Sequence, residues 1–311
     1  MGVEARIVMF APDRERAEEA ARAAYARIAE LEQAYSDYRP TSELMTLCAG
    51  PVGEPQALGP DLARLLPIAA KIGADSGGAF DVTIGPLVRL WREARRTGEM
   101  PEVAALMIAL HQSGWAMMEL SDGGTALTLR EAGMGLDLGG IGKGDAAQQA
   151  VEVLRARGVD RCMVGLAGDI AAGAPPPRAR AWVVDASPRV EARAQVRLRG
   201  SAVSTSGDAS QFVEIGGVRY SHIVDPRTGV GVTNRQAAMV VASRGEIADA
   251  LASALCVLDV AEAEGLIRKY PDAGAVVWLA EEAGGGCRVI DPHGVLEGTL
   301  TLEPATEGSA R

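Results

Sequence analysis

The sequence is poor in the residues that build the common zinc and disulfide sites. Its four cysteines, Cys48, Cys162, Cys256 and Cys287, lie far apart and form no CxxC pair. We interpret them as small apolar residues and not as zinc ligands or a disulfide framework. The three histidines do not have the spacing of an HExxH motif. These absences exclude the familiar zinc motifs built from cysteine and histidine.

The chain also lacks a long apolar run and an excess of positive charge. No window approaches the roughly 18 consecutive apolar residues of a membrane-spanning helix, and no leader is visible at the N-terminus. A leader could have preceded Met1, so the compartment stays open. The net charge of −10 argues against a general nucleic-acid binder. An anionic ligand would therefore need local help from a metal or from backbone dipoles.

What the chain does contain predicts an α+β protein. With 311 residues, of which 48% are hydrophobic, it can bury a large core. Asp13 is a plausible N-cap for a helix that runs to about residue 34. Short strands separated by Gly, Pro and Ser from residue 162 to about residue 220 are typical of antiparallel sheet, and another strand is expected at 236–242. Further helices are expected at about 62–72, 144–157, 246–258 and 260–270, and hairpins at 115–129 and around 284–286.

The stretch from Asp137 to Asp169 is the most informative, because it begins with DLGGIGKG directly before a predicted helix. Glycines let a backbone approach a ligand closely, and a helix N-terminus favours anions. It is not a P-loop, since Gly144 and not Ser or Thr follows Lys143, and its glycines do not fit GxGxxG. A phosphate site and a tightly packed turn both remain open here.

Three other patterns could carry chemistry. Asp249 and Ser253 are four residues apart on one predicted helix face, and their oxygens suit a hard cation, although Asp249 could simply interact with the helix dipole. His222 lies in RYSHIVDPRTG and is a candidate base or a structural histidine. The STSGD segment that ends at Asp208 has hydroxyls, but no GxSxG elbow surrounds them.

Taken together, these segments resemble the FAD:protein FMN transferase family, the ApbE-type flavin transferases. The resemblance runs from Met1 to about residue 280 and rests on SDYRPTSEL, GGAFDVTIGPLVRLW, DLGGIGKG, LAGDI, VSTSGD, RYSHIVDPRTG and ADALASAL. It implies a T-fold-like α+β fold with duplicated antiparallel sheets and packed helices. We expect a single domain over 1–303, or two intimately associated subdomains, followed by a frayed tail over 304–311.

The resemblance also implies an activity. Members of the family use magnesium to transfer FMN from FAD to a threonine hydroxyl of a target protein, and they release AMP. Their targets are typically subunits of membrane redox complexes. We therefore expect FAD as substrate, Mg²⁺ as cofactor and such a subunit as partner, with an extracytoplasmic, membrane-associated location and a cytoplasmic one as the alternative.

Family roles carry over to matching positions of this chain. The metal would be held by the main-chain carbonyl of Gly140, the carboxylate of Asp249 and the hydroxyl of Ser253. His222 would take the proton of the acceptor threonine, with Asp81 or Asp208 as rivals, and Lys143 would add a positive charge near the phosphates. The residues expected around FAD are Met1, Tyr38, Ala79, Phe80, Asp81, Asp137, Lys143 and Val224.

Two other functions stay open. Water could replace the acceptor threonine, which would make the protein an FAD pyrophosphatase that yields free FMN and AMP. Alternatively, the chain could bind FAD without catalysis. Ser253 replaces a common threonine and keeps the oxygen ligand, whereas Gly165 and Cys48 stand where the family often has asparagine and could weaken polar contacts to the flavin.

Overall fold

The structure is a computed structural model, and it describes residues 2–187, 193–209, 211–280 and 285–303. Its central element is a seven-stranded sheet in which every neighbouring pair is antiparallel. In spatial order the strands are β1 (Ala5–Met9), β5 (Cys162–Leu166), β6 (Asp169–Ala172), β9 (Ala202–Ser206), β14 (Ala237–Ala242), β15 (Ala273–Trp278) and β16 (Cys287–Ile290).

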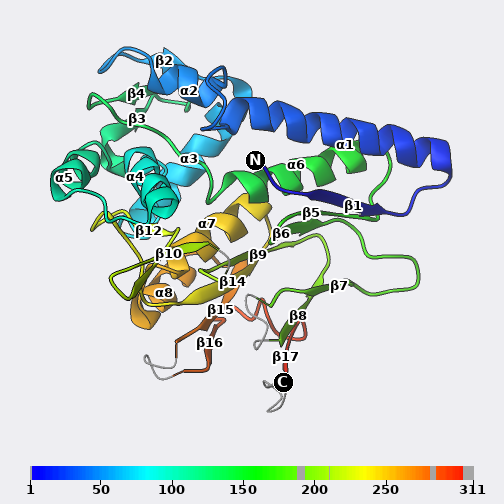
Figure 1. Cartoon of the computed structure of the whole chain (residues 1–311). Coiled ribbons are helices and arrows are strands. Elements are labelled where there is room, and N and C mark those ends of the chain that lie inside the picture. The colour runs from blue at the N-terminus through cyan, green and yellow to red at the C-terminus, as the bar shows by residue number, and fades with distance from the viewer. Residues whose placement is uncertain (1, 188–192, 210, 281–284, 304–311) are drawn as a thin grey trace.

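Helices cover one face of this sheet (Figure 1). They are α1 (Arg14–Tyr35), α3 (Pro60–Asp75), α6 (Gly142–Ala156) and α7 (Gly245–Leu255). The Asp13 side chain accepts a hydrogen bond from the Arg16 backbone N–H, which confirms the predicted cap of α1. Small side chains such as Ala24, Ala147 and Ala252 are fully buried in the core between these helices and the sheet. This lets the helices lie close to the strands.

The opposite face is covered by a second, three-stranded sheet, β17–β8–β7 (Leu300–Glu303, Arg193–Leu198 and Trp182–Asp185). Strand β8 alternates exposed and buried residues, as a strand with one solvated face does. Its buried Val196 and Leu198 join Val241 and Val276 of the large sheet in a second core. The large sheet is therefore buried on both faces.

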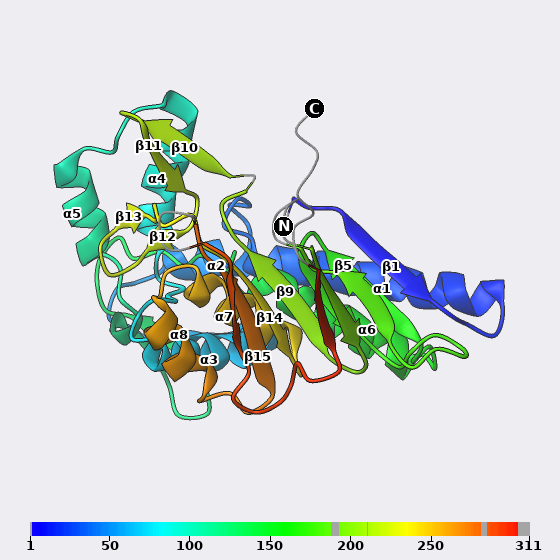
Figure 2. The same cartoon turned by 90° about the horizontal axis from the view of Figure 1, so that it is seen from below.

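A separate lobe projects beside the sheet (Figure 2). It consists of α4 (Gly85–Thr97), α5 (Val103–His111), the hairpin β10–β11 (Phe212–Ile215 and Val218–Ser221) and the pair β12–β13 (Val224–Asp225 and Val230–Gly231). Trp91 is buried in this lobe, packs against the tilted Tyr220 ring with ring centroids 5.2 Å apart, and donates to the Gly229 carbonyl at 2.8 Å. This bond ties α4 to the turn between β12 and β13.

The remaining elements surround the helical face. They are α2 (Glu43–Cys48), the small sheet β2–β4–β3 (Gln56–Ala57, Ala126–Leu129 and Met118–Leu120), the 3-10 helix η1 (Trp115–Met117) and α8 (Val260–Ile267). The prediction that a strand begins at Trp115 was wrong. The Trp115 backbone N–H donates to Asp81 Oδ2 at 2.8 Å and the Met117 N–H to the Gly114 carbonyl, which closes a tight turn instead.

Helices packed on antiparallel sheet confirm the expected α+β class. Among the described residues, no helix combines the length and the apolar character needed to cross a membrane. No disulfide joins the cysteines of the described ranges; Cys162 and Cys256 are buried and the other two are half-buried. The predicted tail at 304–311 lies outside the described residues, and so does Met1.

Candidate functional site

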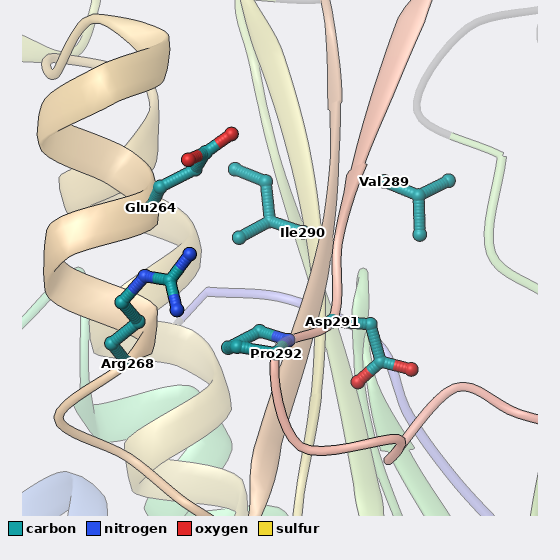
Figure 3. Close-up of a pocket in the computed structure, with 6 residues that line it drawn as sticks. All are labelled: Glu264, Arg268, Val289, Ile290, Asp291 and Pro292. Atoms are coloured by element: carbon teal, nitrogen blue, oxygen red, sulfur yellow. The ribbon is translucent and has the colours of Figure 1, made fainter.

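A cleft of about 460 Å³ lies where the central sheet, the N-terminus of α6 and the projecting lobe meet. Its volume is in the range of small-molecule sites. A second hollow, of about 220 Å³, lies between α8 and β16, where Glu264 and Arg268 face the segment around Ile290 (Figure 3). There the Asp291 carboxylate already accepts hydrogen bonds from the backbone N–H groups of Val295 and Leu296. The larger cleft is the candidate site.

The glycine segment before α6 forms one wall of the cleft. Asp137 Oδ1 accepts from the Gly139 backbone N–H at 2.7 Å, and Oδ2 accepts from Arg92 at 3.0 Å. Burial and the neighbouring Asp37 raise the pKa of Asp137, and Arg92 counteracts them. The Arg92 guanidinium also lies 4.3 Å from the centre of the Tyr38 ring, which is 70% exposed. Asp137 thus holds the glycine segment in place through these two bonds. Arg92 positions the Tyr38 ring at the edge of the cleft.

The segment before α4 forms the neighbouring wall. Asp81 Oδ1 accepts from the Thr83 backbone N–H at 2.8 Å and the Thr83 hydroxyl at 2.7 Å, while Oδ2 accepts from the Trp115 N–H. Burial raises the pKa of Asp81, and these bonds lower it. Both carboxylate oxygens are therefore engaged in holding the turn. This turn presents the buried Ala79 and Phe80 to the cleft.

Lys143 lies in a nest of oxygen atoms at the start of α6. Its Nζ contacts the Gly139 carbonyl at 2.8 Å, Asp169 Oδ2 at 3.1 Å and both oxygens of Asp249 at 3.4 Å. Burial alone would lower the pKa of Lys143, but Asp249 and Asp169 together raise it. Burial and the nearby Asp169 raise the pKa of Asp249 to about 7. The positive charge of Lys143 thus stabilises two buried carboxylates.

The oxygen atoms around Lys143 fit a hard cation. A Cβ added to Gly140 would lie 2.9 Å from Ser253 Oγ, so the absence of a side chain lets the main chain approach that hydroxyl. Within the described residues, Asp169 Oδ1 and Ser204 Oγ are buried without a hydrogen-bond partner. Carboxylate, hydroxyl and carbonyl oxygens are ligands that Mg²⁺ accepts.

The protein ligands are few. No group of three or more His, Cys, Asp or Glu side chains in the described ranges is placed to ligate a metal. A magnesium ion at this position would therefore complete its coordination with water or with phosphate oxygens of a ligand.

His222 lies on the other side of the cleft, next to β12. Its Nδ1 is 3.0 Å from the Gln211 carbonyl oxygen, which can only accept, so Nδ1 carries the hydrogen and Nε2 keeps its lone pair. Burial lowers the pKa of His222 and favours this neutral form. Asp208, by contrast, is buried in an ion pair with Arg219 at 3.0 Å. The geometry thus gives His222 a basic nitrogen, while Asp81 and Asp208 are engaged elsewhere.

The structure brings nearly all the predicted site residues together. Asp249 does not line the cleft itself but contacts Lys143, which does. Met1 is outside the described residues. The predicted residues that line the cleft are Tyr38, Ala79, Phe80, Asp81, Asp137, Gly140, Lys143, His222, Val224 and Ser253. Sequence reasoning assigned no role to Asp169 or Arg92, which also line it. The only signal for Asp169 was its place at the end of the LAGD segment.

Comparison with known proteins agrees with this α+β fold. The sequence matches the ApbE family over residues 1–278. A protein named FAD:protein FMN transferase from Treponema pallidum is 31% identical over 294 residues, which cover 88% of this chain and 80% of that protein. One of the same name from Salmonella typhimurium is 27% identical over 260 residues, or 81% of this chain and 73% of that protein.

Solved structures agree as well. A mutant of the flavin transferase ApbE from Vibrio cholerae superposes with a TM-score of 0.84 at 25% identity, covering 94% of this chain and 95% of that one. The apo flavinyl transferase ApbE from Pseudomonas stutzeri gives a TM-score of 0.81 at 26% identity, covering 96% and 97%. The chain therefore belongs to the ApbE family, and the resemblance inferred from its sequence is confirmed.

Proposed function

We propose that this protein is an FAD:protein FMN transferase. In this proposal the cleft binds FAD with Mg²⁺, transfers the FMN half to a threonine hydroxyl of an acceptor protein, and releases AMP. The observation that carries the proposal is the position of Lys143, between two buried carboxylates and beside a glycine segment, in a cleft of ligand size. The shared name of the curated relatives supports the same activity.

The two ends of the cleft would have different tasks. Tyr38, Phe80 and Asp137 would contact the flavin half of FAD, together with the buried Val224. At the other end, the Gly140 carbonyl, Asp249 and Ser253 would hold magnesium. When bound, magnesium supplies neutralising charge to the diphosphate of FAD.

His222 would act on the acceptor. Its Nε2 accepts the proton of the threonine hydroxyl while the threonine oxygen forms a bond to the FMN phosphorus. The bond from this phosphorus to the bridging oxygen breaks, and AMP leaves with that oxygen and the electron pair. Lys143, which lines the cleft, would stabilise the negative charge on the leaving phosphate.

The acceptor would be a second protein that presents a threonine to the open side of the cleft. By the family resemblance we propose a subunit of a membrane redox complex, met on the extracytoplasmic side of the membrane.

The decisive experiment mixes the protein with FAD, Mg²⁺ and a threonine-containing acceptor peptide. Mass spectrometry of the peptide should show the added mass of FMN, and chromatography should show AMP in equal amount. A peptide with valine in place of the threonine is the control and should stay unmodified. Free FMN without modified peptide would instead support an FAD pyrophosphatase, and FAD binding without AMP would support a non-catalytic carrier.

A further inference from the structure

Asp169 is a buried carboxylate beside Lys143 that the function proposed above does not use as a ligand or a base. It is 2% exposed, and its Oδ2 lies 3.1 Å from Lys143 Nζ. The same ammonium lies 3.4 Å from both oxygens of Asp249, which is also buried. Asp249 receives a further hydrogen bond from the Gly144 backbone N–H at 2.9 Å. One ammonium group thus lies between two carboxylates on different elements, β6 and α7.

The surroundings of Asp169 are richer in oxygen than one ammonium requires. Asp169 pairs with Ser204 in the register of β6 and β9, and alternate residues put Ser204 and Ser206 on the face of the sheet that α7 covers. Ser206 Oγ lies 3.5 Å from Ser253 Oγ. Within the described part of the chain, Asp169 Oδ1 and Ser204 Oγ are buried and have no partner. Buried oxygens without a donor are costly, and a cation would satisfy them.

We propose that Asp169 and Asp249 form a two-carboxylate cage for a cation, and that the ammonium of Lys143 is its tethered occupant until a divalent cation displaces it. This inference rests on the proposed function, because the released ammonium would then face the diphosphate in the cleft that Lys143 lines. Two cations held by the same two carboxylates would repel each other strongly in a buried site, so the metal and the ammonium compete for these carboxylates. Asp169 is thereby a binding residue for the metal.

The test measures Mn²⁺ binding to the FAD-free full chain by electron paramagnetic resonance of the unbound ion. Lys143→Gln removes the competing ammonium but keeps a polar side chain that is one atom shorter, and we expect Mn²⁺ to bind about tenfold more tightly or better. Asp169→Asn removes one carboxylate charge and should weaken Mn²⁺ binding about tenfold or more. The double variant should lie between the two single variants.

A matched pair of controls exists on the surface. Lys71 and Asp75 form an ion pair at 2.5 Å, in which Lys71 is exposed and Asp75 half-buried, and neither residue lines the cleft, so Lys71→Gln and Asp75→Asn make the same charge changes outside it. Neither should alter Mn²⁺ binding by more than about twofold, because exposed charges are screened. If Asp169→Asn does not fold, Asp169→Ser serves in its place, and Lys143→Gln tests the competition independently.

Two results would overturn the proposal. Lys143→Gln that binds Mn²⁺ no more tightly than wild type would show that the ammonium does not compete for the cage. A folded Asp169 variant with wild-type Mn²⁺ affinity would show that Asp169 is not part of it. The titration contains neither flavin nor acceptor, so its outcome is separate from the transfer assay. If the wild-type protein fails in the transfer assay while Lys143→Gln binds Mn²⁺ more tightly than wild type, only the proposed function is overturned.

Discussion

Gly144 and Gly245 are in backbone contact where the first turns of α6 and α7 cross. A Cβ added to Gly144 would lie 2.2 Å from the Gly245 carbonyl oxygen, and one added to Gly245 would lie 2.1 Å from the Gly144 carbonyl oxygen. Because both positions lack a side chain, the Gly144 N–H reaches the carboxylate of Asp249. The contact therefore sets where Asp249 lies relative to Lys143.

Gly245→Ala should destabilise the protein by about 1–3 kcal/mol, because the backbone of α6 must shift to admit the methyl group. Urea unfolding followed by circular dichroism measures the change. Gly265→Ala is the matched control within α8, where an added Cβ meets nothing within 4 Å. That variant should be as stable as wild type or gain up to about 1 kcal/mol, since alanine favours helix. Equal stability of the two variants would contradict the proposed packing.

Asp249→Ala should abolish magnesium-dependent AMP release, because the change removes the charged ligand that we propose for the metal. AMP is measured by chromatography over a range of Mg²⁺ concentrations. Glu264→Ala on α8, at the smaller hollow of Figure 3, removes an acidic side chain outside the cleft and should behave as wild type. AMP release at the wild-type rate in Asp249→Ala would remove this residue from the metal site.

His222→Ala should slow flavin transfer by roughly 10²- to 10⁴-fold, the usual contribution of a general base. FAD binding, followed by flavin fluorescence, should persist, because the imidazole would act on the acceptor and not on the flavin. His293→Ala is a suitable control, since that ring contacts the Arg268 carbonyl outside the cleft. Transfer at the wild-type rate in His222→Ala would show that another group accepts the proton of the threonine hydroxyl.

The transfer rate should rise with pH along a single acid limb whose midpoint lies below 6.5. Burial lowers the pKa of His222 from that value, so the ring is protonated and inactive only at more acidic pH. The profile is measured at saturating Mg²⁺, because protons compete with the metal for Asp249, whose pKa is about 7 without it. A limb that persists unchanged in the residual activity of His222→Ala would refute the assignment.

Local patterns made much of this structure predictable. The Asp13 cap, the glycine segment before α6 and the spacing of Asp249 and Ser253 are all read within a few neighbouring residues. Asp169 could not be assigned in this way, because its neighbours are distant in the sequence. Its ion pair with Lys143 and its pairing with Ser204 across two strands form only when the chain is folded. The predicted start of the hairpin at Trp115 was wrong for the same reason. The turn there is held by a hydrogen bond to Asp81, which belongs to another segment.

Helix α5 was missed altogether. Its sequence, VAALMIALH, has no polar face to show a helical period, and Val103, Met107 and Ile108 are more than half exposed.

The bond from the Gly144 N–H to Asp249 joins residues 105 positions apart in the chain. During synthesis, a ribosome that has completed the glycine segment must still make strands β5, β6, β9 and β14 of the central sheet before it makes α7, which carries Asp249. Contacts of such long sequence separation form late in folding. A nascent or truncated chain that ends before α7 therefore contains Tyr38, Phe80, His222 and Val224 of the cleft but lacks Asp249 and Ser253, two of the proposed ligands of the metal.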